Sequence, residues 1–256
     1  MRTSDELRTL VEDALAELVP STDVAGLDDA VRYALEGGGK RIRPVLCLAV
    51  GEALGRDPVE LLPAACAVEL VHSFSLVHDD LPALDDDDTR RGRPSTWAQF
   101  GEAVAVLAGD ALLAEAFTLA LSYPTPAVAR ELAEATIGMI RGQYLDVTGA
   151  AADLASLNRL KTGRLFEAAV GCALAAAQVP ELEQRRWRAF AQDLGTLFQL
   201  VDDLLDGDGA VVAHGVPATR RLADAAAEHA LAALSELDSD TSVLRGLVES
   251  LATRTA

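Results

Sequence analysis

Long apolar runs with helical spacing, separated by short clusters of turn residues, most constrain what this chain can fold into. Alanine and leucine fill most apolar positions, and aromatic residues make up only 4% of the 256 residues. Both residues favour helices, and the apolar positions recur with the helical period. We therefore predict an all-α fold, with helices near 4–18, 26–36, 43–54, 59–80, 94–121, 127–147, 155–177, 181–206, 216–236 and 241–253.

The expected breaks fall at glycine- and proline-rich turns. They are GGG at 37–39, RDP at 56–58, the aspartate run with Pro82, YPTP at 123–126 and DGDG at 206–209. No stretch reads as a linker or a low-complexity tract, and half of the residues are hydrophobic. A chain of this length can bury a sizeable core, so we expect one domain over residues 1–256.

The charge balance excludes one class of partner. The formal net charge is −18, and a chain this acidic repels a phosphate backbone, so we expect no nucleic-acid partner. An anionic substrate would need recruited cations. Only two of the 22 basic residues are lysines, Lys40 in EGGGKRIRP and Lys161 in NRLKTGRLF.

The sequence favours a cytoplasmic protein without a stable membrane anchor. The opening MRTSDELRTLVEDALAEL is acidic and amphipathic, unlike a signal peptide. The run AAVGCALAAAQV is too short and too rich in alanine to span a bilayer. Cys47, Cys66 and Cys172 are scattered among apolar residues, which indicates a reduced environment.

The stretch FQLVDDLLD places several carboxylates near the end of a predicted helix. Gln199, Asp203 and Asp206 share one helix face with Asp202 beside them, while Val201 and its leucine neighbours face the core. Adjacent carboxylates repel one another, and negative charge at a helix C-terminus is unfavourable because of the helix dipole. Carboxylates without histidine or cysteine suit a hard ion such as Mg²⁺. Alone, the motif fits a metal site and an ordinary acidic helix end equally well.

The stretch LVHDDLPALDDDDTRRGRP follows an apolar helix that we expect to be buried. Its first aspartates need a partner or a metal, because burying a free carboxylate is costly. Pro82 interrupts the helix, so Asp79 and Asp85 must meet across a local break. Arg90 and Arg91 follow, and arginine binds phosphate bidentately. Carboxylates, Mg²⁺ and arginines together predict a diphosphate site. We interpret His78 as a helix-packing residue.

Six motifs together resemble the trans-isoprenyl diphosphate synthases. They are HDDLPALDDDDTRRGRP, FQLVDDLLD, GGGKRIRP, LAGDALL, GQYLDV and RLKTG, and the likeness runs from about residue 26 to 206. The resemblance implies a bundle of roughly ten core helices around a deep cavity, and a homodimer. It also implies the joining of isopentenyl diphosphate to an allylic diphosphate with Mg²⁺ as cofactor.

The family's site residues carry over onto matching positions. The metal set it implies is Asp79, Asp85 and supporting Asp80 in the first motif, and Asp202 with outer-shell Asp203 and Asp206 in the second. The isopentenyl diphosphate site it implies is Lys40, Arg43, His72 and Arg91. The allylic set it implies is Arg90 as the diphosphate clamp, with Lys161, Thr162 and Gln199 holding the allylic group and steadying the cation. Asp146 is expected to orient one of the basic groups.

Residues just before the first motif set product length in this family. Phe74 and Ser75 precede Asp79 by five and four residues, which places Phe74 under the growing chain. A phenyl ring there predicts the fifteen-carbon product, farnesyl diphosphate, with the twenty-carbon geranylgeranyl diphosphate as the alternative.

The segment after Asp206 departs from the family pattern. The family carries a glycine-lysine loop and further lysines there, whereas this chain has no lysine, and Arg220 and Arg221 are the candidate substitutes. Two other readings stay open: a weakly active or non-catalytic subunit of a heteromeric synthase, and a class I terpene cyclase. Intact aspartate motifs and lysines argue against the first, and VDDLLD lacks the second metal motif of the cyclases.

Overall fold

The protein is a bundle of α-helices, as the sequence predicts. The computed structural model describes residues 1–18, 22–151 and 153–254. The N-terminal half contains α1 (Ser4–Glu17), α2 (Ala25–Glu36), α3 (Ile42–Ala53), α4 (Pro58–Asp79), the hairpin β1 (Thr89–Arg90) and β2 (Arg93–Pro94), α5 (Thr96–Phe100) and α6 (Glu102–Ala120). The C-terminal half contains α7 (Ala127–Thr148), α8 (Leu154–Asn158), the π-helix η1 (Arg159–Gly163), α9 (Arg164–Ala176), the 3₁₀ turn η2 (Glu181–Glu183), α10 (Arg185–Asp206), α11 (Gly209–His214), α12 (Val216–Ser235) and α13 (Ser242–Ala252).

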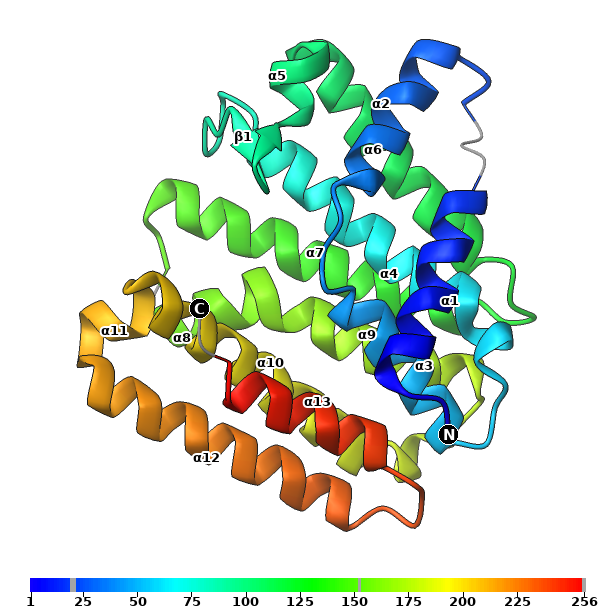
Figure 1. The fold of residues 1–256 in the computed structure, drawn as a ribbon, viewed down its shortest axis with the longest axis vertical. Helices are drawn as coiled ribbons and strands as arrows, with labels where there is room; N and C mark the ends of the chain where they lie inside the picture. Colours follow the sequence, from blue (N-terminus) through cyan, green and yellow to red (C-terminus); the bar gives the residue numbers. More distant parts are fainter. Residues whose placement is uncertain (19–21, 152, 255–256) are drawn as a thin grey trace.

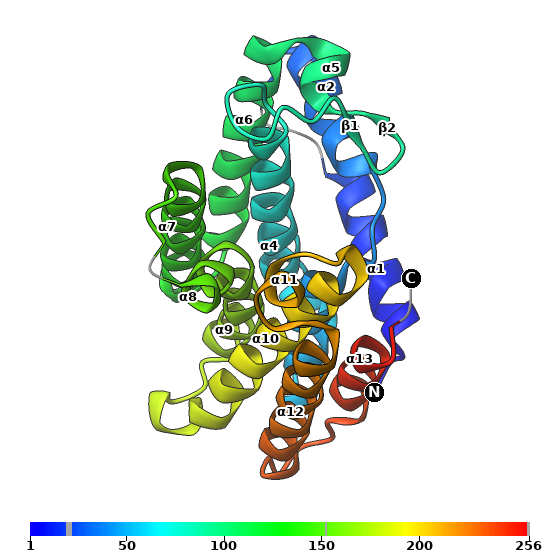
Figure 2. The same ribbon diagram turned by 90° about the vertical axis from the view of Figure 1, so that its left-hand side faces the viewer.

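Helix α4 lies at the centre of the bundle, between α6, α3 and α9 (Figures 1 and 2). Asp57 caps its first turn by accepting a hydrogen bond from the Val59 N–H at 3.1 Å, and Pro58 occupies the first helical position. Most of its apolar side chains are buried in one continuous core. The acidic end of α4 therefore emerges from the buried core, with Asp80 buried and Asp79 half-buried.

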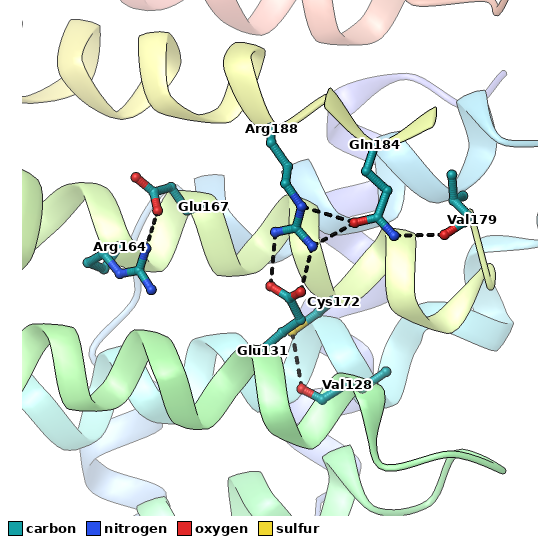
Figure 3. A network of polar contacts seen from close by, with 8 residues as sticks. All are labelled: Val128, Glu131, Arg164, Glu167, Cys172, Val179, Gln184 and Arg188. Carbon is teal, nitrogen blue, oxygen red and sulfur yellow. Dashed lines mark hydrogen bonds and ion pairs between the residues drawn. The ribbon is translucent and has the colours of Figure 1, made fainter. Parts of the chain in front are cut away.

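A polar network fastens α7 to α10 on the side of the bundle away from the hairpin (Figure 3). The Arg188 guanidinium of α10 donates to both carboxylate oxygens of Glu131 on α7, at 2.6 and 3.2 Å. Gln184 accepts from Arg188 and donates to the Val179 carbonyl at 2.7 Å, which ties in the turn after α9. Bidentate charge-assisted bonds of this kind fix orientation, so α10 is held in place relative to α7.

Three expected helices are divided in the structure, and those expectations were wrong in detail. The span 94–121 contains α5 and α6, because Gly101 takes a φ of +87° that ends one helix and starts the next. The span 155–177 contains α8, the π-helix and α9. The span 181–206 begins with a 3₁₀ turn and becomes α-helical at Arg185. Uniform alanine-rich periodicity conceals such local changes of winding.

Two elements were not expected at all. The β-hairpin falls in what the sequence predicts to be the loop before the next helix, and the helix α11 follows the DGDG turn directly. Both are too short to show periodicity. The hairpin turn consists of Arg91 and Gly92, with φ of +53° and +77°, the conformation that two-residue hairpin loops favour.

Of the described helices, α4 and α6 are long and apolar enough to cross a membrane by composition. The core helices of water-soluble proteins meet the same test, and 67% of the apolar window of α4 is buried inside the fold. Only 33% of the corresponding window of α6 is buried. An unusually apolar surface therefore remains along α6.

Candidate functional site

The first aspartate motif folds back on the end of α4. Asp79 is the last residue of the helix, and the Asp85 N–H donates to its carbonyl at 2.9 Å. The Asp87 N–H donates to the Asp80 carbonyl at 3.1 Å. These bonds close the break around Pro82 and bring Asp85 beside Asp79, as the sequence predicts. Asp79 is half-buried, whereas Asp85 is exposed.

Asp80 and Arg90 form the main ion pair of this region. The Asp80 side chain is buried, and its Oδ1 and Oδ2 accept hydrogen bonds from Arg90 Nε at 2.9 and 3.2 Å. A terminal guanidinium nitrogen also contacts Oδ1. The hairpin thus delivers Arg90 to the helix end, and Asp80 holds the guanidinium there. The role of Asp80 beside a metal stays a prediction.

Arg91, at the hairpin turn, reaches the glycine loop between α2 and α3. Its guanidinium donates to the Gly38 carbonyl. A Cβ at Gly39 would lie 2.8 Å from this guanidinium, and Gly39 has a φ of +134°. Only glycine allows this close approach. The loop that carries Lys40 therefore packs directly on Arg91, so two of the residues expected at the isopentenyl diphosphate site come from one corner of the molecule.

A buried ion pair that sequence reasoning missed anchors this loop. Arg41 lies between Lys40 and Arg43, and its guanidinium donates to Glu69 of α4 at 2.6 Å and to the Leu35 carbonyl at 2.7 Å. Both charged side chains are almost fully buried. The available signal was Glu69 itself, a carboxylate inside an otherwise apolar stretch of helix that needed a partner.

Arg43 and His72 form a buried basic pocket below the loop. The Arg43 guanidinium lies over the rings of Phe166 and Phe198, with centroids at 4.7 and 5.5 Å. Its terminal nitrogen lies 3.5 Å from His72 Nε2, and its Nε finds no partner among the described residues. Burial lowers the pKa of Arg43 to about 10, so the group stays positively charged. An unpaired buried cation of this kind suits an anionic ligand.

His72 is neutral in this pocket. Burial first, and then the positive charges of Arg43 and Arg91, hold the pKa of His72 well below its usual value. The neutral imidazole can therefore form hydrogen bonds to a ligand, whereas the arginines supply the positive charge.

The π-helix carries Lys161 and Thr162 and packs beside α7. Lys161 forms an ion pair with Asp146 of α7, so Asp146 does contact a basic group of the site, as expected. A Cβ at Gly142 would lie 2.8 Å from the Lys161 backbone nitrogen, so glycine at that position lets α7 pack against the π-helix. Such local changes of winding are frequent at functional sites.

At the end of α10, the two adjacent aspartates of the second motif, Asp202 and Asp203, make different contacts. Asp203 is buried, accepts from Gln199 Nε2 at 2.7 Å, and accepts from the Ala210 N–H at 2.8 Å. It holds Gln199 and the start of α11. Asp202 is half-buried and lies 3.5 Å from the Arg254 guanidinium, and Asp206 is exposed. The sequence interpretation placed Asp203 with the metal-supporting set and did not foresee its contact with α11.

Each motif is influenced by charges of its own surroundings. Burial raises the pKa of Asp202, the charge of Asp206 raises it further, and Arg254 and Arg43 lower it. Burial also raises the pKa of Asp79 to about 6, with Lys161 opposing the shift and Asp85 adding to it. Each helix end therefore has a basic group from another part of the chain near its carboxylates.

The donor set fits a magnesium ion shared with a ligand. No three carboxylate, imidazole or thiol groups within residues 1–18, 22–151 and 153–254 are placed to hold a metal by themselves. However, Asp79 is a half-buried carboxylate destabilised by burial and by Asp85, which a cation would relieve. Mg²⁺ commonly uses one or two carboxylates together with substrate phosphates. Asp79 and Asp85 are the residues that would hold it, and Asp202 would hold a further ion at the second motif.

An apolar cavity of about 300 Å³ begins at this charged region and runs between α4 and α7. Phe74 and Ser75 line it, as expected, on the side of α4. Asp79 and Lys161 lie at the same cavity. Its remaining lining consists of His78, Leu84, Met139, Ile140, Gln143, Tyr144 and Val147. The cavity is therefore charged at one end and largely apolar along its walls.

Gln143 is a candidate functional residue that sequence reasoning missed. It lines the cavity, and both polar atoms of its side chain are buried without a partner in the described part of the chain. Buried amides normally have partners, so this side chain is suited to a ligand in the cavity. Its place in GQYLDV, three residues before Asp146, was the available signal.

The two candidate substitutes for the missing lysines lie apart from this cavity lining. Arg220 donates to the Ala252 carbonyl at 3.4 Å and so braces the end of α13, and Arg221 is exposed on α12. Arg254, which follows α13, is the basic residue that reaches Asp202. Nothing in the sequence singles it out, because the contact depends on how α13 returns to α10.

Comparisons with known proteins agree on one family. Residues 24–231 match the family model described as polyprenyl synthetase. A geranylgeranyl diphosphate synthase of Cyanophora paradoxa is 40% identical over 216 residues, which cover 78% of this chain and 72% of that protein. A farnesyl diphosphate synthase of Geobacillus stearothermophilus is 40% identical over 229 residues, 83% of this chain and 77% of that protein.

Solved structures give the same result. The crystal structure of a geranyltransferase from Legionella pneumophila superposes with a TM-score of 0.89 at 32% sequence identity. The match covers 98% of this chain and 96% of that chain. The helical bundle therefore has a counterpart over nearly its whole length among solved proteins of similar sequence.

Proposed function

This chain belongs to the polyprenyl synthetase family and is an enzyme of the farnesyl or geranylgeranyl diphosphate synthase type; from that premise we propose that it makes farnesyl diphosphate. It would join isopentenyl diphosphate to dimethylallyl or geranyl diphosphate and release inorganic diphosphate. The observation that carries the proposal is the cavity with Asp79 and Lys161 at one end and Phe74 on its wall.

The basic residues divide between two diphosphates. Arg43, with its unpaired Nε, Arg91 and Lys40 would bind isopentenyl diphosphate, with neutral His72 as a hydrogen-bonding partner. Arg90, held by Asp80, would clamp the allylic diphosphate. Guanidinium groups already fixed by protein contacts bind phosphate without losing further side-chain freedom.

Mg²⁺ bound by Asp79, Asp85 and Asp202 would neutralise the diphosphate leaving group. Lys161, Thr162 and Gln199 would hold the allylic group and stabilise the positive charge left on its carbons, with the oxygens of the Thr162 and Gln199 side chains and the backbone carbonyl of Lys161 as the groups that can do so. The alkene of isopentenyl diphosphate then forms the new carbon–carbon bond, and the proton that is lost passes to the released diphosphate. Closely positioned reactants gain much of their rate from orientation alone.

Product length would depend on Phe74. The ring is 9% exposed and lines the cavity five residues before Asp79. A prenyl tail that grows from the charged end along α4 meets this ring. The proposal therefore favours fifteen carbons over the twenty-carbon product of the geranylgeranyl synthases.

A product assay tests the proposal. The purified protein is incubated with Mg²⁺, labelled isopentenyl diphosphate and, separately, dimethylallyl, geranyl or farnesyl diphosphate, and the prenyl chains are sized. Chains that end at fifteen carbons are expected. Chains of twenty carbons would contradict the assigned product and the role of Phe74. A folded protein without product from any primer would favour the non-catalytic subunit.

Two substitutions test the role of the cavity wall. Phe74→Ala should lengthen the product, and Ser75→Phe, which adds a ring to the same wall, should shorten it. Phe100→Ala is the matched control, because Phe100 packs against Tyr33 with ring centroids 5.2 Å apart and does not line this cavity. An unchanged product in Phe74→Ala would remove Phe74 from the role.

We also propose that the enzyme is a homodimer through α6 and α7. Ile137, Ile140, Tyr144 and Val147 of α7 are each at least half exposed and share one helix face. The last three also border the cavity, so a partner packed on this face would cover its open side. Leu107 of α6 is 54% exposed, and both helices lie along the left edge of the molecule in Figure 2. Exposed apolar faces of this kind mark interfaces.

Analytical ultracentrifugation tests the dimer. The wild type should sediment as a dimer, and Leu107→Asp should sediment as a folded monomer. A monomeric wild type at micromolar concentration would contradict the proposal.

A further inference from the structure

His78 lines the prenyl cavity, but its Nε2 edge is directed away from the cavity. The residue lies between Phe74 and Asp79 on α4, but its Nε2 reaches the Val106 carbonyl of α6 at 3.0 Å. A carbonyl can only accept, so Nε2 carries the hydrogen. Asp110 of α6 lies 3.9 Å from the same nitrogen. The imidazole is therefore directed toward α6.

A glycine makes this arrangement possible. The imidazole lies directly over Gly109 of α6, where an added Cβ would overlap Nε2 and Cδ2 and lie 3.1 Å from Cε1. Two such atoms cannot occupy the same space, so any larger residue at 109 would displace the ring. The missing side chain of Gly109 forms a recess in α6 that holds the His78 imidazole.

The recess has a consequence for the cavity wall. The His78 ring contacts the Phe74 ring edge to face, with centroids 4.9 Å apart and an interplanar angle of 72°. Both residues line the cavity. On the α6 side, Ala105 and Ala108, close to Gly109 in the helix, are fully buried. The cavity, which His78 already lines, adjoins the ring, so an imidazole expelled from the recess is placed to enter it.

We propose that the recess over Gly109, by holding the His78 imidazole out of the path of the prenyl chain and against Phe74, is a second determinant of product length. Gly109 and His78 are positioning residues in this proposal, and the inference rests on the proposed function of the cavity. Gly109 keeps the cavity open, and His78 limits how far it can widen around Phe74.

The two residues give opposite outcomes when changed. In Gly109→Ala the expelled imidazole narrows the cavity, and the ratio of fifteen- to ten-carbon product should fall about tenfold or more, the discrimination that one misplaced group gives in an apolar pocket. In His78→Ala the wall loses a ring and Phe74 loses its support. The ratio of twenty- to fifteen-carbon product should then rise by about tenfold.

The double variant separates this device from a general packing defect. In Gly109→Ala combined with His78→Ala the new methyl group meets no imidazole, so the product distribution should match His78→Ala alone within about twofold. A double variant that keeps the short products of Gly109→Ala would overturn the proposal, because the methyl group would then act through the backbone. A wild-type distribution in Gly109→Ala would overturn it as well.

Two control glycines show what packing strain alone does. A Cβ at Gly51 of α3 would lie 2.8 Å from Leu61 Cγ on α4, well before the cavity residues. Gly51→Ala should lower the melting temperature and leave the product distribution unchanged. A Cβ at Gly246 of α13 would meet no atom of the described residues within 4 Å, and Gly246→Ala should change neither property.

A binding measurement keeps the inference separate from the proposed activity. Calorimetry with the unreactive geranyl, farnesyl and geranylgeranyl thiodiphosphates requires no turnover. Gly109→Ala should weaken farnesyl relative to geranyl binding, and His78→Ala should strengthen geranylgeranyl relative to farnesyl binding. A wild type that forms no product but shows these shifts would refute the proposed function and support the inference. Unchanged affinity ratios in both variants would refute the inference whatever the wild type makes.

Discussion

At the end of α4 the buried carboxylate Asp80 is paired with an arginine, whereas at the end of α10 the buried carboxylate Asp203 is held by an amide and a backbone N–H. The first helix end thus holds a cation, Arg90, beside its carboxylates. At the second end the buried carboxylate, Asp203, holds neighbouring protein groups in place. The two aspartate motifs look alike in sequence, yet they are built for different tasks.

The charged groups around the two helix ends differ as well: the first has more positive charge near it than the second. Four arginines lie close enough to His72, which precedes the first motif on α4, for their charges to lower its pKa. At the second motif, burial and Asp206 raise the pKa of Asp202, and Arg254 opposes them from 3.5 Å. The first end can therefore bind anions with the protein's own cations, whereas the second would need a bound metal to do so under the proposed function.

The largest expected effect comes from the first motif itself. Asp79→Asn keeps the shape of the side chain but removes the charge that would bind Mg²⁺, and turnover should fall by about 10³-fold, as when one preorganised charge-stabilising group is lost. The fold should survive, because burial already destabilises this carboxylate. Steady-state kinetics and circular dichroism measure the two properties.

The control for this variant lies in the same run of aspartates. Asp88→Asn makes the same chemical change on an exposed side chain, and its turnover should equal that of the wild type. Full activity in Asp79→Asn would refute the metal assignment and with it the contrast between the two ends.

The second motif should separate stability from activity between adjacent residues. Asp203→Ala leaves Gln199 Nε2 and the Ala210 N–H without their acceptor, which should lower the free energy of unfolding by about 2 kcal/mol. Asp202→Ala should lower it by less than about 1 kcal/mol, because its contact with Arg254 is long and part-exposed, but should abolish turnover. Urea unfolding measures the stability of each variant, and the product assay measures its turnover. Equal losses of stability, or equal losses of turnover alone, in both variants would contradict the separate roles of Asp202 and Asp203.

The sequence predicts these regions to different depths. Helical periodicity and turn residues locate α4 and α10, and the motifs identify the family and its expected ligands. The meeting of Asp79 with Asp85 across the Pro82 break also follows from the sequence, since a proline there prevents a continuous helix. The sequence does not reveal the contacts between different elements, such as Arg41 with Glu69 of α4 or Asp203 of α10 with Ala210 of α11.

Local winding is the second limit of sequence reasoning. The π-helix that presents Lys161 and the hairpin that presents Arg90 each depend on a few hydrogen bonds and on glycines at close approaches. Their residues carry no periodic signal of their own. Motifs in the sequence therefore identify the residues of the site, whereas the orientation of each side chain follows only from how the segments pack.

The burial of His72, together with the cations around it, can be measured through the pH dependence of stability. The native pKa of His72 lies well below the usual value of 6.5, so below that pH the unfolded chain binds one more proton than the native protein. The free energy of unfolding should consequently fall as pH falls below about 6.5, by up to about 1.4 kcal/mol per pH unit. Urea unfolding from pH 7.5 down to 5 should show this component in the wild type and not in His72→Gln.

Other groups titrate in the same range, so the difference between the two proteins is the relevant quantity. Asp79 acts in the opposite direction, because its raised native pKa, about 6, lets the native state hold a proton that the unfolded chain has lost. That contribution is present in both proteins and cancels. Parallel curves for wild type and His72→Gln would show that His72 is not buried among the arginines as described.

The smallest expected effect concerns Arg254, the basic residue that reaches the second end. Its contact with Asp202 is 3.5 Å long, and both side chains are partly exposed, so Arg254→Ala should change stability by less than about 1 kcal/mol. The affinity for the allylic diphosphate should change by no more than about fivefold, the same energy expressed as a binding ratio. Arg221→Ala, an exposed arginine on α12, is the matched control. A much larger loss of allylic affinity in Arg254→Ala alone would mean that the second end has its own protein cation after all. Arg254 would then take over what the family assigns to the lysines that this chain lacks after Asp206.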